Sequence, residues 1–261
     1  MIKTNLTVIE HELIAHNIYS IQLKSEKDLH FVPGEFVHIR VGNGIDPLLR
    51  RPISVCDYDI ENFILTCIYR AEGHGTTLLS KRIVGEQVDI LGPLGQGFPY
   101  TGRKKGDHAL LVGGGIGVPP LFFLAKELVA IGVKVTTVIG FESEKHVFFE
   151  KEFADFGSCY VTTVDGSYGT KGFVTDVLKQ QRADEWDAFY SCGPTPMLKA
   201  MQQTFDNQSI DGYVSLEQRM GCGVGACLAC VCAISEVAET TKKYYKICSD
   251  GPVFPYKEVV I

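Results

Sequence analysis

Residues 108–132 read HALLVGGGIGVPPLFFLAKELVAIG, and the fold class of the chain follows from them. An apolar run of strand type, 108–115, ends in glycines. Residues 119–132 then have a helical composition, with proline in the first turn and Gly132 just after the end. The apolar part is shorter than the ~20 residues of a membrane-spanning helix, and prolines and glycines interrupt it. The stretch therefore predicts a buried strand, a glycine turn and a helix, in a protein without a membrane span.

The same alternation continues on the carboxyl side. Residues 133–141 form the next apolar strand pattern, 146–156 a helical one and 159–164 another strand. Further strand and helix patterns follow up to residue 205. Repeated strand–helix units of this kind predict a parallel, doubly wound α/β sheet.

Three features of this region are candidates for nucleotide binding. The turn Gly113-Gly-Gly-Ile-Gly117 lies between a strand and a helix, as a dinucleotide-binding turn does, but Val118 occupies the position of the third expected glycine. Glu142, after the second strand, has the chemistry to accept the ribose hydroxyls of NAD and to repel a 2′-phosphate; a solvated loop acid is the alternative. Cys192-Gly-Pro194 ends a buried strand, where ligands lie in such sheets, although a small-residue turn has the same sequence.

On the amino side, from Thr4 to about Gly97, the pattern is different. Short β-type runs are separated by turn residues at Pro33-Gly34, Gly42-Asn43-Gly44 and Gly73-His74-Gly75. Several short strands at this spacing predict a small antiparallel barrel or sandwich. The expected strands are NIYSIQLKS, EFVHIRV, RPISVCDY, NFILTCIYR and EQVDILGPLG.

Three segments of this β region have the chemistry of a flavin site. In the sequence RPIS, 51–54, Arg51 can hold a pyrophosphate and Ser54 can hydrogen-bond a flavin ring. The sequence IYR, 68–70, ends the next strand, and GHGTT, 73–77, predicts a helix start with free N–H groups for a phosphate. A turn with a surface arginine would explain RPIS alone, but the three segments in series favour a flavin.

The sequence MGCGVGACLAC, 220–230, carries three cysteines in the spacing C-x4-C-x2-C. Seventeen residues separate the last of them from Cys248. Thiolates are the ligands of iron–sulfur clusters, and the spacing is that of plant-type ferredoxins. Glycines between the cysteines let the loop wrap closely and present backbone N–H groups to sulfur. We therefore predict a [2Fe–2S] cluster held by Cys222, Cys227, Cys230 and Cys248.

The alternative for this module is zinc, which also accepts four cysteines. Paired C-x2-C knuckles are more usual for zinc than a C-x4-C-x2-C loop. Cys232 complicates the ligand set, because on a strand it would point the same way as Cys230. We interpret it as a buried, inert strand cysteine.

Composition sets the cellular context. The net charge of −6 disfavours a nucleic-acid partner, which needs a concentrated excess of Lys and Arg. The N-terminus lacks the apolar region of a signal peptide. Nine cysteines, an odd number with five of them between residues 211 and 261, disfavour a disulfide framework. These features predict a cytoplasmic protein in a reducing environment.

Taken together, these motifs resemble the ferredoxin–NADP reductase superfamily. With the cysteine module added, the whole chain is similar to the electron-transfer subunits of the NAD-dependent, class B dihydroorotate dehydrogenases. The resemblance implies an antiparallel β-barrel for FAD at 1–101, an α/β domain for NAD at 102–210 and a [2Fe–2S] module at 211–261. The segments that carry it are LLRRPIS, IYR, GHGTT, GPLGQGF, GGGIG, DGSYGTKG, CGPTPM, CGVGACLAC and CSDGPVF.

The resemblance also implies cofactor contacts and a partner. The residues that it assigns to FAD are Arg51, Pro52, Ile53, Ser54, Ile68, Tyr69, Arg70, Gly75 and Thr76. The implied partner is an FMN-containing catalytic subunit that oxidises dihydroorotate, in a heterotetramer of two copies of each chain. The chain itself shows no paired acid–base constellation. Two alternatives stay open: a related reductase subunit of a hydrogenase or transhydrogenase-type complex, and a zinc-stapled binding module without enzymatic activity.

Overall fold

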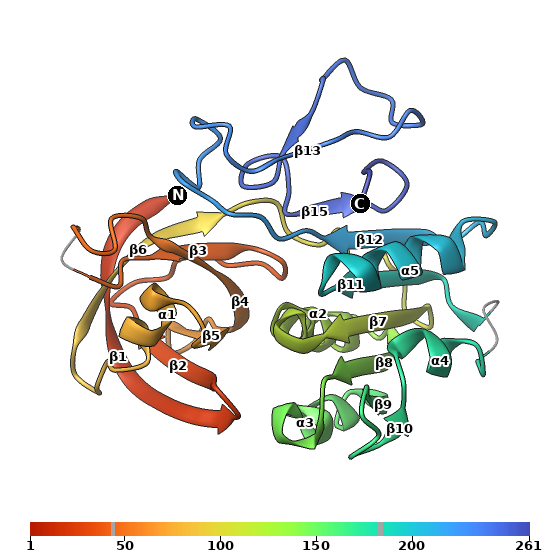
Figure 1. Ribbon diagram of the computed structural model, residues 1–261, viewed down its shortest axis with the longest axis horizontal. Helices are drawn as coiled ribbons and strands as arrows, with labels where there is room; N and C mark the ends of the chain where they lie inside the picture. The colour runs from red at the N-terminus through yellow and green to blue at the C-terminus, as the bar shows by residue number, and fades with distance from the viewer. Residues whose placement is uncertain (43–44, 182–184) are drawn as a thin grey trace.

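A computed structural model of the protein describes residues 1–42, 45–181 and 185–261. Figure 1 shows a β-barrel on one side, an α/β domain on the other, and the C-terminal segment above both. The expected turn at Gly42-Asn43-Gly44 lies partly outside the described residues. In the described part of the chain, no helix combines the length and the apolar character needed to cross a bilayer.

The barrel is closed and antiparallel, in the order β1-β2-β5-β4-β3-β6. Strand residues that point inward fill it, among them Leu6, Ile21 and Leu65, all fully buried. Each expected strand is present, and the long first strand was not predicted. The bounds are β1 Ile2–Ala15, β2 Ile18–Lys24, β3 Phe36–Ile39, β4 Arg51–Asp59, β5 Ile64–Arg70 and β6 Gln87–Leu94, with the short helix α1 His74–Leu79 between β5 and β6.

The second domain is built on a seven-stranded sheet in the order β10-β9-β8-β7-β11-β12-β15. All neighbours are parallel except β12 and β15, which are antiparallel. The strand, glycine turn and helix expected at 108–132 are confirmed as β7, the 3-10 turn η1 and α2. The bounds are β7 His108–Gly114, η1 Gly115–Gly117, α2 Pro119–Ala130, β8 Lys134–Phe141, η2 Glu144–His146, α3 Glu150–Ala154, β9 Gly157–Thr163, β10 Thr170–Lys171, α4 Val174–Leu178, β11 Ala188–Cys192, α5 Thr195–Phe205, β12 Asp211–Ser215 and β15 Val253–Pro255.

Helices cover both faces of this sheet. Leu111 of β7 packs in one buried cluster with residues of α2 and α3, and its neighbours Leu110 and Val112 pack in another with α4 and α5. Alternate residues of one strand thus serve two cores, because successive side chains point to opposite faces. The doubly wound prediction is confirmed.

The barrel is fixed to the sheet domain through α2. Phe123 of α2 belongs to the same buried cluster as the barrel residues, and the Lys126 ammonium donates to the Asp57 carboxylate of β4 at 2.8 Å. Helix α2 therefore packs directly against β4 of the barrel.

The helix expected at 146–156 is shorter than predicted. Only Glu150–Ala154 is helical, because Phe149 has a left-handed backbone, with φ of 67°, and breaks the chain direction. Its ring packs against Phe122 of α2, with 4.9 Å between ring centroids. Packing of an aromatic cluster, which local pattern does not encode, sets the start of this helix.

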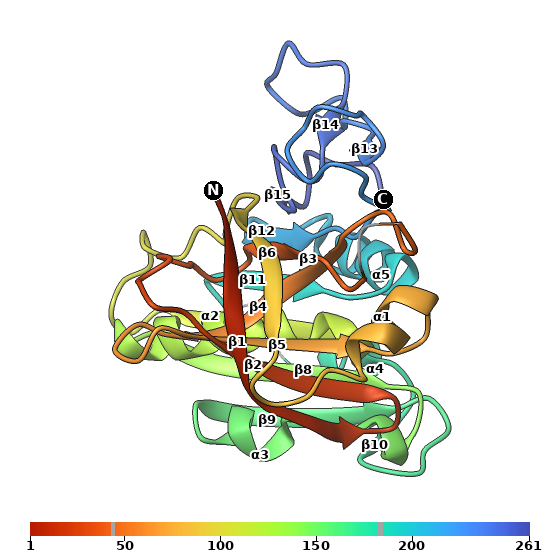
Figure 2. The ribbon, with the colours of Figure 1, turned by 90° about the vertical axis from the view of Figure 1, so that its left-hand side faces the viewer.

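The last fifth of the chain shares its strands with the sheet. β12 and β15 complete the edge of the sheet, and between them the cysteine segment stands out with the small pair β13 Val231–Cys232 and β14 Tyr245–Lys246 (Figure 2). Gln96, just after β6, donates its backbone N–H to the carbonyl of Gly251 at 2.6 Å. The segment therefore rests on both the barrel and the sheet.

Candidate functional site

A cavity of about 230 Å³ lies where the barrel meets the sheet domain. Ser54 from β4, Tyr69 and Arg70 from β5 and Thr76 from α1 line it. Of the nine residues expected at a flavin, seven line this cavity: Pro52, Ile53, Ser54, Ile68, Tyr69, Arg70 and Thr76. The three segments expected to act together, RPIS, IYR and GHGTT, therefore all contribute residues to one site.

Arg51 and Gly75, the other two expected residues, lie next to each other beside this cavity. A Cβ on Gly75 would come within 2.2 Å of the Arg51 Nε, so the guanidinium packs directly on the glycine backbone. The Arg51 Nη1 donates to the Leu49 carbonyl at 2.6 Å. A side chain at this position would move the arginine away from the glycine backbone.

Tyr69 is held firmly in the wall of the cavity. Its hydroxyl hydrogen-bonds the Nε2 of His11 at 2.7 Å, and its ring stacks on Tyr19 with 5.8 Å between centroids. Burial raises the pKa of Tyr69 well above its ordinary value, with Tyr19 adding to the effect. The hydroxyl therefore stays protonated and serves as a neutral hydrogen-bonding group.

Sequence reasoning missed several residues of this cavity. Glu217 is the only carboxylate among them; burial raises its pKa, and the nearby Arg70 opposes that shift. The missed residues are Phe36, Ile116, Ser215, Leu216, Glu217, Gln218, Met220 and Pro252. They come from other parts of the chain, among them β3, η1 and the end of β12, and lie outside the segments that the sequence suggested for a flavin.

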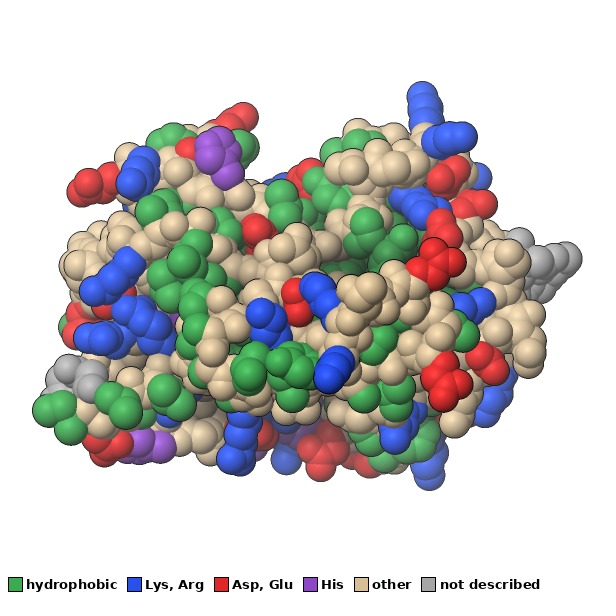
Figure 3. Space-filling model, turned by 90° about the horizontal axis from the view of Figure 1, so that it is seen from above, with side chains coloured by type: hydrophobic (Ala, Val, Ile, Leu, Met, Phe, Trp, Pro, Cys, Tyr) green, Lys and Arg blue, Asp and Glu red, His purple; other side chains and the backbone are tan. Residues whose placement is uncertain are grey.

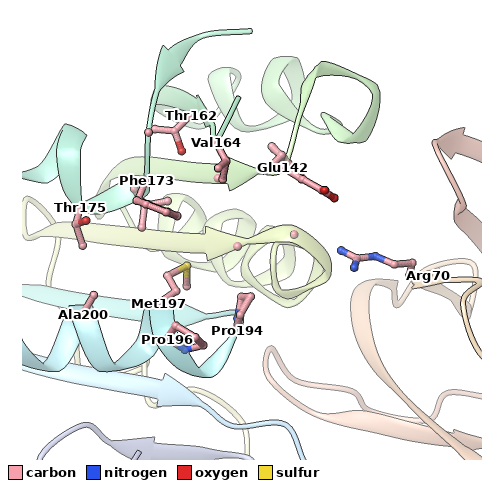
Figure 4. A pocket seen from close by; sticks show the side chains of 16 residues that line it. Arg70, Glu142, Thr162, Val164, Phe173, Thr175, Pro194, Pro196, Met197 and Ala200 are labelled. Carbon is pink, nitrogen blue, oxygen red and sulfur yellow. The ribbon is translucent and has the colours of Figure 1, made fainter. Parts of the chain in front are cut away.

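A second, larger cavity of about 600 Å³ opens at the carboxyl edge of the parallel sheet. Gly114, Gly115, Glu142 and Pro194 line it, and Figure 4 shows the side chains of Glu142 and Pro194 beside it. The three features that the sequence suggested for a nucleotide thus line one cavity. Phe173 and Met197 supply apolar walls, a composition typical of ligand sites.

Close packing explains why glycines occupy this turn. A Cβ on Gly117 would lie 2.4 Å from the carbonyl oxygen of Cys192, and one on Gly114 would lie 2.6 Å from the sulfur of Met197. The turn can therefore approach the end of β11 only without side chains. Because Val118 already begins the helix and is fully buried, the missing third glycine does not disturb this approach.

Arg70 connects the two cavities. It lines both, and Figure 4 shows it reaching from the barrel toward the glycine turn. Its Nη1 donates to Glu72 at 3.2 Å, and a Cβ on Gly115 would lie 3.0 Å from its Nη2. A ligand in one cavity and a ligand in the other would meet at this side chain.

The four predicted cysteine ligands lie together in the C-terminal segment. The backbone N–H groups of Val224, Ala226 and Cys227 all donate to the Cys222 sulfur, at 3.3–3.4 Å. Burial opposes ionisation of this thiol, but the N–H groups of Val224, Cys227 and Ala226 prevail and lower its pKa to about 6. The loop is therefore built to hold a thiolate.

The other two proposed ligands, Cys230 and Cys248, are joined by backbone hydrogen bonds to sulfur. Gly225 donates its N–H to the Cys248 sulfur at 3.1 Å, and Cys248 donates its own N–H to the Cys230 sulfur at 3.4 Å. Cys222 also contacts Cys227 through its side chain, so the thiols form two neighbouring pairs. Among the described residues, no three His, Cys, Asp or Glu side chains converge on one point as a preformed mononuclear site.

Cys232 lies on β13, half-buried, opposite Tyr245 of β14. Burial raises the pKa of its thiol to about 11. Its place on a strand agrees with the position expected from the sequence, and the inert role of Cys232 stays a prediction.

Comparison with known proteins places these sites in context. Residues 217–260 match the family model described as the iron–sulfur cluster binding domain of dihydroorotate dehydrogenase B, and residues 111–203 match the oxidoreductase NAD-binding domain. The electron transfer subunit of dihydroorotate dehydrogenase B (NAD(+)) from Geobacillus sp. (strain WCH70) is 54% identical over the full length of both chains. The subunit of the same name from Bacillus mycoides (strain KBAB4) is 52% identical, again over both full lengths.

Solved structures agree. An NADH-dependent reduced ferredoxin-NADP oxidoreductase superposes with a TM-score of 0.84 at 30% identity, covering 98% of this chain and 89% of that one. A cytochrome P450 reductase from Amycolatopsis gives a TM-score of 0.68 at 25% identity, over 80% of this chain and 67% of the other.

Proposed function

The chain belongs to the family of electron-transfer subunits of NAD-dependent dihydroorotate dehydrogenase B, and from this premise we propose which of its residues carry the function. The protein passes electrons from the FMN of a catalytic partner, by way of a [2Fe–2S] cluster and FAD, to NAD⁺. With that partner it completes the reaction of dihydroorotate and NAD⁺ to orotate, NADH and a proton, in pyrimidine biosynthesis.

The main support for the proposal is that the three sites lie next to one another in the structure. Arg70 lines both the nucleotide cavity and the flavin cavity, and Met220, two residues before Cys222, lines the flavin cavity from the other side. Nucleotide, flavin and cysteine loop thus follow one another without an intervening domain. Electron carriers must lie close together for electron transfer between them to be fast.

FAD would be held by the nine expected residues. Arg51, packed on Gly75, and the start of α1 at Thr76 would face its phosphates, since a guanidinium binds phosphate oxygens in pairs. Ser54 and Tyr69 would hydrogen-bond its polar edges. The apolar Ile53 and Ile68 would pack against the ring.

When bound, FAD links two-electron hydride chemistry to the one-electron chemistry of an iron–sulfur cluster. The protein contributes binding and orientation and needs no general base for this. Glu142 would hold the ribose of the nucleotide, and Pro194 and Met197 would exclude water from beside it. Arg70 and Glu217, of opposite charge, both face the flavin cavity and would set its electrostatics.

The metal ligands would be Cys222, Cys227, Cys230 and Cys248. The support is chemical: the peptide N–H groups that point at the Cys222 and Cys248 sulfurs stabilise thiolates and offset the negative charge of a four-thiolate centre. All nine cysteines are free thiols, as in a protein of the reducing cytoplasm, which is where we propose that it acts.

We infer a heterotetramer of two copies of each subunit as the working assembly. Around the cysteine loop the apolar side chains of Val224, Leu228 and Val231 are exposed, at 41%, 49% and 40%. Exposed apolar groups beside a redox centre would both dock a partner and exclude water from the path.

The test is a visible spectrum of the protein purified with its partner, with iron, acid-labile sulfide and FAD measured on the same sample. We expect flavin and iron–sulfur bands that bleach on anaerobic addition of dihydroorotate and of dithionite, and that return with NAD⁺. Zinc in place of iron, or protein without flavin, would contradict the proposal. Bleaching by dithionite but not by dihydroorotate would point instead to a related reductase subunit with another partner.

A further inference from the structure

His38 lies on β3 at the boundary between the barrel and the cysteine segment. In this strand Val37 and Ile39 point into the barrel core, so Phe36 and His38 point out of it. Phe36 belongs to the same buried cluster as Cys230 and Cys248. The outer face of β3 therefore meets the part of the chain that carries the proposed metal ligands.

His38 is a buried histidine, and both of its ring nitrogens are unpaired in the described part of the chain. The residue is 0% exposed, and neither Nδ1 nor Nε2 has a hydrogen-bond partner among the described residues. Burial, reinforced by Arg50, lowers the pKa of His38 to about 4, so the ring is neutral and carries one N–H. Buried polar groups in proteins are almost always paired, and an exception calls for a bound partner or a functional role.

The ring lies against one residue of the cysteine loop. A Cβ on Gly223 would come within 2.7 Å of the His38 Cε1 and 2.9 Å of both ring nitrogens. Gly223 has a φ of +74° and follows Cys222 directly. Both the left-handed backbone and the absent side chain let the loop close onto the imidazole.

We propose that His38 is a hydrogen-bond donor from the barrel to the sulfur atoms of the iron–sulfur centre. The inference rests on the proposed function, because it needs that centre. It explains why a polar ring occupies an otherwise apolar contact, since the acceptor exists only when the centre is bound. It also makes the barrel, and not only the loop, part of the surroundings that set the reduction potential.

The loop's own donors leave room for a further one. The peptide N–H groups of Val224, Ala226 and Cys227 point at the Cys222 sulfur, and that of Gly225 at the Cys248 sulfur. These donors come from the loop itself, whereas His38 contacts the loop at Gly223 from β3 of the barrel. The flavin is the less suitable acceptor, because Phe36 lines the flavin cavity and His38 does not.

The expected effect follows from charge. A hydrogen bond to sulfur stabilises the reduced, more negative centre and so raises its reduction potential. Removal of the donor should shift the reduction equilibrium of the centre about tenfold toward the oxidised form, which corresponds to about 59 mV for one electron.

The experiment compares three variants in the holoenzyme with its partner: His38→Leu, His38→Gln and, as a matched control, the exposed His30→Gln. Redox titration followed by electron paramagnetic resonance gives the potential of the centre, and iron and FAD contents are measured alongside. We expect a lower potential in His38→Leu, partial recovery in His38→Gln, which keeps an N–H, and no change in His30→Gln. An unchanged centre in His38→Leu, or a shift in the flavin potential alone, would overturn the proposal.

A second measurement covers the case in which His38→Leu does not assemble the centre. Wild-type protein with ¹⁵N-histidine should show a nitrogen hyperfine coupling to the reduced centre that disappears in His38→Gln. Absence of that coupling in an iron-containing wild-type sample refutes the role of His38 and leaves the electron-transfer function intact. A wild-type sample without iron would refute the proposed function itself.

Discussion

The cysteines of the C-terminal segment differ from one another in their surroundings more than in their chemistry. Backbone N–H groups converge on Cys222 and lower its pKa to about 6 against the effect of burial, whereas burial raises the pKa of Cys232 to about 11. The spacing of the residues nominated four ligands, and the contacts of the loop support the same four. The direction of the pKa shift alone does not separate ligands from other cysteines, because burial also raises the pKa of the proposed ligand Cys248, to about 12. The assignment rests on the spacing and on the loop contacts.

At this scale the first prediction concerns one ligand. Cys227→Ser should remove or destabilise the cluster, because a hydroxyl is a poor substitute for thiolate, and NAD⁺ reduction by dihydroorotate should fall by two orders of magnitude or more. Exchange between NADH and an artificial acceptor through FAD should persist. Iron content and the two activities measure this.

Cys232→Ser is the matched control, since it changes a cysteine of the same segment outside the proposed ligand set. We expect full iron content. Loss of iron in this variant would overturn the ligand assignment, and loss of both activities in Cys227→Ser would show that the cluster also holds the fold together.

At the scale of elements, the strand ends of the parallel sheet create the nucleotide site. β7 ends in the glycine turn, β8 in Glu142 and β11 in the Cys192-Gly-Pro194 turn, and all three reach the same cavity. Parallel strands bring their carboxyl ends to one edge of the sheet, which is why residues far apart in sequence meet there.

Glu142 at the end of β8 gives a prediction on cofactor choice. Glu142→Gln should lower the preference for NADH over NADPH about tenfold, because it removes both a charge-assisted hydrogen bond to ribose, worth about 1.5 kcal/mol, and a charge that repels the 2′-phosphate. Values of kcat/KM for the two nucleotides measure it. Glu144→Gln, an exposed acid two residues on and outside the cavity lining, should leave the preference unchanged. Equal behaviour of the two variants would mean that Glu142 is only a solvated loop acid.

At the scale of the whole molecule, the cysteine segment is the outermost of the three sites. It stands above the barrel and the sheet, and from above its face shows apolar side chains among charged ones (Figure 3). The nucleotide cavity lies at the edge of the sheet, on the far side of the flavin cavity. This order gives the protein one end that meets a small ligand and one that meets a second protein.

A charged substitution of Leu228, which is 49% exposed and adjacent to Cys227, tests whether this outer face binds the partner. Leu228→Glu should weaken association with the catalytic partner at least tenfold, because it buries a charge in the interface. Iron and FAD contents should not change. Val129→Glu, on α2 and 38% exposed, is the control and should leave association unaltered. Analytical ultracentrifugation of the mixed subunits measures the effect, and equal association in both variants would place the interface elsewhere.

Much of the fold and of the metal site could be predicted from the sequence, because the sequence signals involved are local. The short β-type runs predicted a small antiparallel barrel or sandwich, and the strand–helix alternation predicted the doubly wound sheet. The glycine turn predicted the start of α2, and the cysteine spacing nominated the metal ligands. Each depends on neighbouring residues whose spacing fixes their relation in space. The long strand β1 was missed, and the helix at α3 was overestimated, since aromatic packing around Phe149 sets its start.

Only the tertiary structure decided how the sites join. That Arg70 belongs to two cavities, that Glu217 and Met220 face the flavin cavity, and that His38 lies against Gly223 could not be read from any motif. The last contact joins residues separated by most of the chain. Such contacts depend on how a barrel, a sheet and a loop dock against one another, and that docking minimises the exposed apolar surface of the whole molecule, which no short segment encodes.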